Sequence, residues 1–243
     1  MFSVFKKMRG AKRPRCAALV AAAGSSSRMG GINKLLEPLD GIPVLARTLT
    51  VLQQAETVDE IIVATREEDL VEISHLCKTY GITKCSKVIR GGETRVHSVM
   101  LAAMEVSPET KLLAVQDGAR PLVTTEVIDR TVLAAVRCGA AAPAVPVKDT
   151  VKVIDKNAAV TETPDRSTLR AVQTPQVFDA AILKAALQAA VDKELPITDD
   201  CSAVEHLGKT VYLVEGDEEN IKITTPMDII LAEAILRRRE GRV

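Results

Sequence analysis

The sequence predicts a three-layer α/β protein of Rossmann-like type, in which helices cover both faces of a mainly parallel sheet. Short apolar runs alternate with helical patterns from residue 16 to about residue 147, which is the rhythm of strand–helix–strand units. The first run, residues 16–23, is apolar throughout and is typical of a central strand covered on both faces. An alternating segment interrupts this rhythm after Asp149 and predicts an inserted β-hairpin arm.

Five strands are expected in the first part of the chain, each rich in small or branched apolar residues: residues 16–23, 60–65, 87–90, 111–116 and 140–147. Helices with apolar residues at helical spacing are expected between them: residues 43–55, 67–80, 94–105 and 125–138. A proline opens the first helix, Thr124 or Thr125 caps the fourth, and Gly81 and Gly139 follow two of the helices, where glycine commonly ends a helix.

The expected hairpin has strands at 150–154 and 159–163 and a turn at 155–157. It carries too few large apolar residues to be stable alone, so we expect it to lie against another surface, such as a second subunit. Beyond it we expect helices at 179–191, 198–207 and 226–239 and a strand at 210–214. The predicted organisation is a basic tail over residues 1–15 and a single domain over 16–243, with residues 149–173 forming the β-arm for dimerisation.

Charge and aromatic content exclude several classes of partner. The 32 basic and 32 acidic residues balance, so no global basic field exists to hold a nucleic acid. Aromatic residues make up 2% of the chain, which argues against base-stacking platforms for single strands. No window is long and apolar enough to span a bilayer. We therefore expect neither a nucleic-acid nor a membrane partner.

The cysteines and the N-terminal segment indicate a cytoplasmic protein. Five cysteines lie far apart without a CxxC pair, which favours reduced thiols over a disulfide framework or a zinc site. The first fifteen residues carry six basic residues and no long apolar core, so they are not a secretory signal. We expect this segment to be a disordered tail.

The loop after the first strand combines small residues with two cations. Residues 21–27 read AAAGSSS, and Arg28 and then Lys34 follow. Small residues let a backbone approach a ligand closely, and exposed backbone N–H groups hold phosphate oxygens. The combination favours a nucleotide triphosphate, and an ordinary exit from a strand remains the alternative.

Two further loops follow strands that we expect to be parallel to the first. Gly91 and Gly92 lead into a helix, where backbone groups and Ser98 would read a base or its ribose, or would only cap the helix. Asp117 ends another strand, where it would hold Mg²⁺ or a ribose hydroxyl, or serve as a turn residue. Ligands of such sheets bind beyond the carboxyl ends of the strands, so these loops should converge there. Lys222 would return a third cation to the same place, unless it is an ordinary surface lysine.

Several short motifs occur in a fixed order along nearly the whole chain: AAAGSSSRM with NK, GGETRVHSV, DGARP, PVKDTVK, DR, TPQ, TDD and NIKIT. Their order and spacing resemble the 2-C-methyl-D-erythritol 4-phosphate cytidylyltransferase family. The resemblance implies a nucleotidyltransferase fold with a protruding β-arm, in a homodimer whose arm reaches the partner's active site. It also implies transfer of CMP from CTP to the alcohol phosphate, with release of pyrophosphate, in isoprenoid precursor synthesis.

The resemblance assigns roles to individual residues. The cations expected to stabilise the negatively charged transition state are Arg28, Lys34 and Lys222. The expected contacts to CTP are Ala22, Ala23, Gly24, Ser25, Gly92, Glu93, Ser98, Asp117 and Gly118. Mg²⁺ or another divalent cation would bridge the triphosphate oxygens, with Asp117 as a protein ligand. The phosphate of the second substrate would be held by Thr150 and Arg166 of the partner's arm and by Thr174 and Lys222.

Two positions depart from the family's pattern, since Ser26 stands where a second glycine is common and Glu93 where an aspartate is common. Ribitol 5-phosphate is the nearest alternative substrate, although the small residue before Arg120 favours methylerythritol phosphate. A non-catalytic nucleotide-binding protein is the second alternative, and the presence of all three cations argues against it. A dinucleotide-dependent oxidoreductase lacks support, because no GxGxxG follows the first strand.

Overall fold

One mixed sheet of eight strands organises the computed structural model, which describes residues 13–24 and 33–242. Its strands are β1 (Arg15–Ala22), β4 (Glu60–Thr65), β5 (Cys85–Arg90), β6 (Thr110–Asp117), β7 (Ala140–Pro146), β10 (Arg170–Val172), β11 (Gln176–Asp179) and β12 (Tyr212–Glu215). They follow the order β10-β7-β11-β6-β1-β4-β5, and β12 also pairs with β7. Strands β6, β1, β4 and β5 are mutually parallel, whereas β11 runs antiparallel to β6 and β7.

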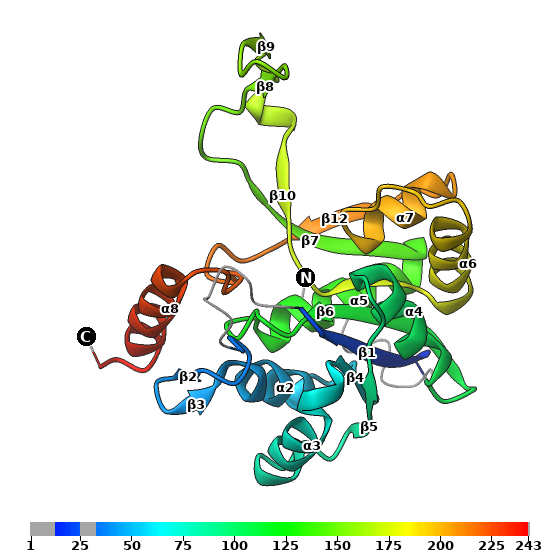
Figure 1. The fold of residues 1–243 in the computed structure, drawn as a ribbon, viewed down its shortest axis with the longest axis vertical. Coiled ribbons are helices and arrows are strands. Elements are labelled where there is room, and N and C mark those ends of the chain that lie inside the picture. Colours follow the sequence, from blue (N-terminus) through cyan, green and yellow to red (C-terminus); the bar gives the residue numbers. More distant parts are fainter. Residues whose placement is uncertain (1–12, 25–32, 243) are drawn as a thin grey trace.

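Helices cover both faces of this sheet, so the three-layer prediction is confirmed (Figure 1). One face packs against α2 (Val44–Gln54), α3 (Leu70–Thr79), α5 (Thr125–Cys138) and α8 (Pro226–Arg239). The other face packs against α4 (Arg95–Met104), α6 (Ala180–Asp192) and α7 (Asp200–His206). Neighbouring residues of β1 serve opposite faces: Val20 belongs to the first core and Leu19 to the second. This is the alternation that a strand imposes on its side chains.

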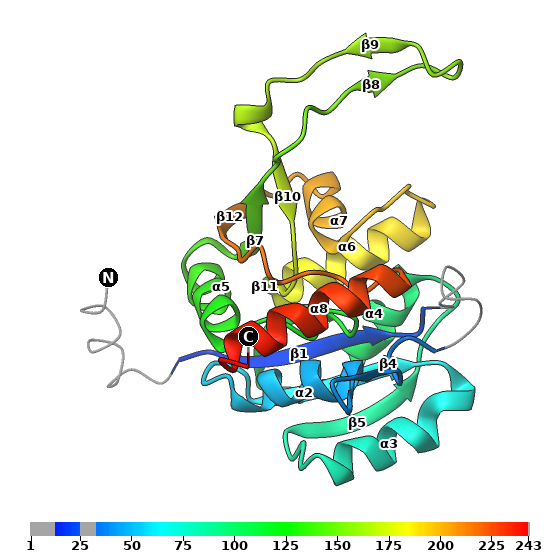
Figure 2. The same cartoon turned by 90° about the vertical axis from the view of Figure 1, so that its left-hand side faces the viewer.

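A two-stranded arm extends away from the body, as Figure 2 shows. Its strands β8 (Val153–Ile154) and β9 (Val160–Glu162) pair with each other in a sheet separate from the main one. The short 3-10 helix η4 (Arg166–Thr168) and then β10 lead the chain back to the body. Three apolar residues of the arm are about half exposed: Val153 at 42%, Ile154 at 57% and Val160 at 58%.

The remaining elements are a small hairpin of β2 (Pro38–Leu39) and β3 (Ile42–Pro43) and a 3-10 helix, η3 (Glu67–Asp69), before α3. Thr124, and not Thr125, caps α5 through its side chain, and Gly139 ends that helix with φ +79°. Asp199 caps α7, since its side chain accepts a hydrogen bond from the N–H of Ser202 in the first turn of that helix. No helix in the described part of the chain has the length and apolar character needed to cross a bilayer.

The sequence did not predict β11, which lies between β6 and β7 and makes the sheet mixed. Its Val177 and Phe178 are fully buried. Asp179 was expected to open the following helix, but it ends β11 and accepts hydrogen bonds from the first backbone N–H groups of α6. A four-residue strand is too short to show a period, so only its pairing with two neighbours defines it.

The carboxyl ends of the parallel strands converge at one edge of the sheet, as expected. The Gly118 N–H donates to Ala21 O at 3.1 Å, which joins the ends of β1 and β6. A Cβ placed on Gly91 would lie 2.8 Å from both Ala23 Cβ and Ser98 Oγ. The first loop therefore contacts the glycine turn so closely that a side chain at Gly91 has no room.

Candidate active site

The strand β1 delivers the first predicted loop to this edge. Ala22 is buried at the end of β1, and Ala23 and Gly24 follow it toward the surface. Lys34 lies where the described chain resumes, in the turn that packs Leu35 into the core. The predicted positions Ser25, Ser26 and Arg28 lie outside the described residues. The structure therefore fixes the two ends of the predicted phosphate loop.

The glycine turn before α4 is held by the helix that follows it. Ser98 Oγ accepts from the Gly92 N–H at 3.1 Å and lies 2.9 Å from Thr94 O, to which it donates. A Cβ on Gly92 would lie 2.4 Å from His97 Cβ, so this position also requires glycine. Since the Ser98 hydroxyl is used inside the turn, its direct effect is to shape the turn. Glu93 is exposed beside it.

Three cations surround the carboxylate of Asp117, at the carboxyl end of β6. Its Oδ2 lies 2.8 Å from Lys222 Nζ and 3.6 Å from Arg120 Nε, and its Oδ1 lies 3.6 Å from Arg95 Nη2. Burial raises the pKa of Asp117, but Lys222 and then Arg95 outweigh that effect and hold the pKa below its ordinary value. Asp117 is therefore an anion in the site, and the structure brings it together with the predicted Lys222.

Arg95 and Asp200 form a buried ion pair beside Asp117. Arg95 Nη2 lies 2.7 Å from Asp200 Oδ2, and the Asp200 side chain is 0% exposed. Burial raises the pKa of Asp200, and the attraction of Arg95 offsets this only in part. Among the five groups joined by these ion pairs, three cations (Arg95, Arg120 and Lys222) face two carboxylates, an excess of one positive charge. Such a site favours an anionic ligand.

The sequence did not predict Arg95, Arg120 or Asp200 as site residues. All three lie inside motifs that carry the family resemblance, GGETRVHSV, DGARP and TDD. The available signal was their position in the chain. Arg95 and Asp200 each begin a helix, and Arg120 follows the end of β6, at the edge where such sheets bind ligands. Their contacts with Asp117 are tertiary, so the sequence could not pair them.

Thr174 makes two hydrogen bonds beside the site. Its Oγ1 accepts from the Asp117 N–H at 3.1 Å, and its carbonyl accepts from Asn220 Nδ2 at 3.0 Å. The Asn220 carbonyl in turn accepts from Arg120 Nη1 at 2.6 Å. These bonds connect β6 with the segment that carries Lys222, and they fix the distance between Asp117 and Lys222.

The arm residues Thr150 and Arg166 are not brought to this cluster within one chain. Both are exposed, and Arg166 Nη1 donates to Lys148 O at 2.5 Å at the base of the arm. A pocket of about 670 Å³ lies there, lined by Pro146, Val147, Lys148, Asp165, Arg166, Ser167 and Arg170. This pocket has a basic character suited to an anionic group.

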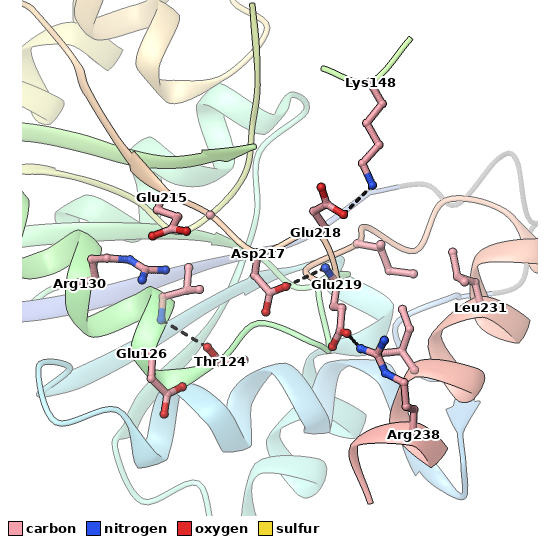
Figure 3. Close-up of a pocket in the computed structure, with 14 residues that line it drawn as sticks. Thr124, Glu126, Arg130, Lys148, Glu215, Asp217, Glu218, Glu219, Leu231 and Arg238 are labelled. Atoms are coloured by element: carbon pink, nitrogen blue, oxygen red, sulfur yellow. Dashed lines mark hydrogen bonds and ion pairs between the residues drawn. The ribbon is translucent and has the colours of Figure 1, made fainter. Parts of the chain in front are cut away.

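Another pocket, of about 750 Å³, lies between α5 and α8 and contains none of the predicted site residues. Figure 3 shows Lys148 and Glu218 paired at its rim and Glu219 meeting Arg238 across it. Four of its eight charged lining residues therefore neutralise one another in these two ion pairs. It is a surface groove of the fold, apart from the site at the strand ends.

Within residues 13–24 and 33–242, no group of three or more histidine, cysteine or acidic side chains is arranged to hold a metal. Asp117 is the carboxylate at the strand ends that was predicted to do so, and cations face both of its oxygens. Asp117 therefore fits a divalent cation as a single carboxylate ligand, and the oxygens of the bound substrate would supply the other ligands.

The model of the family described as 2-C-methyl-D-erythritol 4-phosphate cytidylyltransferase matches residues 16–238. The chain belongs to this family. Two proteins of that name are similar to it: one from Alkaliphilus metalliredigens (strain QYMF) is 44% identical, covering 91% of this chain and 93% of its own, and one from Syntrophus aciditrophicus (strain SB) is 40% identical, covering 95% of this chain and all of its own.

Solved structures of this cytidylyltransferase family have the same fold. The 4-diphosphocytidyl-2C-methyl-D-erythritol synthase from Anaerococcus prevotii DSM 20548 is 32% identical, with a TM-score of 0.83 and coverage of 92% of this chain and 96% of its own. The cytidylyltransferase from Thermus thermophilus is 32% identical, with a TM-score of 0.74 and coverage of 92% and 99%. The family resemblance expected from the motifs is confirmed.

Proposed function

We propose that this chain transfers CMP from CTP to 2-C-methyl-D-erythritol 4-phosphate, and so forms 4-diphosphocytidyl-2-C-methyl-D-erythritol and pyrophosphate for isoprenoid precursor synthesis. Its membership of the cytidylyltransferase family carries this proposal. The positively charged site at the strand ends supports it, because both substrates are anions.

The CTP contacts are proposed along the converging loops. The backbone of Ala22, Ala23, Gly24 and Ser25 would hold the triphosphate, and the turn at Gly92 and Glu93, shaped by Ser98, would bind cytosine. Asp117 and Gly118 would bind the ribose. The close contact between the first loop and Gly91 supports one continuous nucleotide site.

Catalysis is proposed to rest on positioning and on charge. An oxygen of the second substrate's phosphate attacks the α-phosphorus of CTP, the bond to the β-phosphate breaks, and pyrophosphate leaves. Arg28, Lys34 and Lys222 would stabilise the negative charge that gathers on the α-phosphate as the attack proceeds. Lys222 is kept near its place by the ion pair to Asp117. There is little covalent chemistry for the protein to perform.

A bound Mg²⁺ or other divalent cation would neutralise triphosphate oxygens and orient the leaving group. We propose that the triphosphate supplies most of its ligands, with Asp117 as the one protein carboxylate beside it. The three cations that face Asp117 support this minor role, because they compete with a metal for its oxygens.

A homodimer is proposed, in which each arm completes the partner's site. Thr150 and Arg166 of the arm would then join Thr174 and Lys222 around the phosphate of the second substrate. Support comes from the half-exposed valine and isoleucine residues of the arm, because an isolated hairpin is at best marginally stable in water. The basic pocket at Arg166 supports an anionic ligand there.

The absence of disulfides among the five cysteines supports the cytoplasm as the location.

Pyrophosphate release from CTP measures this function directly. We expect release with methylerythritol phosphate to exceed release with ribitol 5-phosphate by at least tenfold in kcat/KM, a difference of about 1.4 kcal/mol in transition-state binding. A preference for ribitol 5-phosphate would replace the proposed substrate. CTP binding without turnover on either alcohol would favour the non-catalytic nucleotide-binding alternative.

A further inference from the structure

The ion pair between Arg95 and Asp200 lies directly behind the proposed ribose contact. One nitrogen, Arg95 Nη2, approaches two carboxylates: it is 2.7 Å from Asp200 Oδ2 and 3.6 Å from Asp117 Oδ1. The first distance is that of a close charged contact, and the second is beyond the range of a hydrogen bond. The guanidinium is therefore held by Asp200 at a short distance from Asp117.

The position of Asp200 is fixed by its backbone. The N–H groups of Asp200 and Cys201 both donate to Gln176 Oε1 at 3.0 Å, and Gln176 Nε2 donates to Asp199 Oδ2 at 2.8 Å. Gln176 belongs to β11, in the middle of the sheet. The start of α7 is thus held to the sheet, and the carboxylate of Asp200 is fully buried against Arg95.

The two oxygens of Asp117 have different surroundings. Oδ2 lies 2.8 Å from Lys222 Nζ, whereas the ion pair that Oδ1 makes within the described residues is the distant one to Arg95. Oδ1 thus lies near a positive charge without a hydrogen bond to it, and it can accept a hydrogen bond from a ligand. Without Asp200, the guanidinium would close the gap and occupy Oδ1 as a donor.

We propose that Asp200 is a positioning residue, which draws the Arg95 guanidinium away from Asp117 and so keeps Asp117 Oδ1 open to accept a hydrogen bond from a ribose hydroxyl of CTP. This inference rests on the proposed function only in that CTP is taken as the ligand. It assigns a role in nucleotide selection to a residue that does not touch the nucleotide.

The test compares binding of CTP and of 2′- and 3′-deoxy-CTP, each with Mg²⁺, by titration calorimetry. A hydrogen bond to a charged group corresponds to a preference of roughly tenfold to a hundredfold, so wild-type protein should bind CTP more tightly than one deoxy analogue by about that factor. In Asp200→Asn this preference should fall to within about twofold of unity, because Arg95 then covers Oδ1.

The decisive variant is the double substitution Arg95→Gln with Asp200→Asn. It removes both members of the pair, so nothing covers Oδ1, and the preference for CTP should return to at least half of its wild-type value. A purely structural role for the pair would leave the double variant as impaired as Asp200→Asn, which would overturn the proposal. Arg95→Gln alone is less informative, because it leaves the buried carboxylate of Asp200 without its partner.

Asp59→Asn is the matched control. Asp59 also pairs with an arginine, with Arg13 Nη1 2.6 Å from its Oδ2, but it precedes β4 at the opposite edge of the sheet. It should keep the wild-type preference. A wild-type protein without any preference for CTP over both deoxy analogues would overturn the inference. If wild-type protein shows the preference and the two variants behave as expected but methylerythritol phosphate is not used, the proposed function fails and this inference stands.

Discussion

The residues around Asp117 show how charges at the strand ends organise this site. Lys222, Arg95 and Arg120 hold its pKa below the ordinary value in spite of its burial, so the carboxylate stays ionised from neutral pH down into the acid range. Because the folded pKa lies below the unfolded one, this ionisation favours the folded state above pH ~4 and ceases to do so as the pH falls through the lowered value.

Lys34 is the residue whose catalytic role is most directly testable. Lys34→Ala should lower kcat by roughly a hundredfold to a thousandfold, since a cation that stabilises developing charge acts mainly in the transition state. The dissociation constant of CTP should change by less than about fivefold, because several backbone groups share the triphosphate. Steady-state kinetics and calorimetry measure the two quantities.

Lys78→Ala removes an exposed lysine from the last turn of α3 and serves as the control for Lys34→Ala. It should leave kcat and CTP affinity at wild-type values. Unchanged turnover in Lys34→Ala would refute the assigned role.

At the level of elements, the start of α8 determines where Lys222 can lie. Asp228 accepts from the N–H groups of Thr224 and Thr225 at 2.8 and 2.7 Å and also from their hydroxyls. Lys222 lies three residues before Thr225, the N-cap residue of α8. The cap therefore fixes the segment that returns the third cation to the strand ends.

Asp228→Ala should lower the free energy of unfolding by about 1 kcal/mol at pH 7, the usual effect of losing such a cap. Burial raises the pKa of Asp228, but the hydrogen bonds from Thr224 and Thr225 outweigh it and lower the pKa. The stabilisation is therefore full above pH ~4 and is lost as the pH falls through the lowered value, so the two proteins should converge in acid. Urea unfolding at several pH values measures this difference.

Glu233→Ala is the control on the same helix, since Glu233 is partly exposed and pairs with Arg237 at 3.3 Å, away from the cap. Glu233→Ala should change the free energy of unfolding by less than about 0.5 kcal/mol at every pH. A constant difference between Asp228→Ala and wild type down to pH ~2 would show that the carboxylate does not supply the cap.

At the scale of the whole molecule, the arm and the strand-end site are far apart within one chain (Figure 2). Two inactive proteins should therefore complement each other in a dimer. Lys34→Ala keeps an intact arm, and Arg166→Ala keeps an intact strand-end site. A mixed dimer holds one complete site, so co-expression in equal amounts should restore about a quarter of the wild-type rate, because random pairing makes half of the dimers mixed.

Pyrophosphate release by the separately tagged, co-purified pair measures this complementation, and each variant purified alone is its control. An arm that served its own chain would give no activity in the mixed dimer, because each chain would then contain one defective part. That outcome would reject the proposed exchange of arms.

The parallel strands, their helices and the place of the arm were predictable, because apolar periodicity and glycine or threonine caps are local signals. The meeting of the glycine turn at 91 and 92 with Asp117 at one edge of the sheet was likewise predictable from their place after strands. The antiparallel strand β11 was not, since Val177 and Phe178 become a strand only by pairing with β6 and β7. The roles assigned from motifs to Lys34, Lys222 and Arg166 stay predictions that the experiments above test.

The sequence by itself determined the layered fold, the family and the edge of the sheet at which ligands are expected, because these depend on local periodicity and on motifs in a fixed order. Only the tertiary structure decided which charges meet: Lys222 and Arg95 come to Asp117 from segments about a hundred and about twenty residues away in the chain. It also revealed Asp200, which the fold buries against Arg95. An ion pair depends on the distance between side chains in space, and a single sequence does not contain that distance.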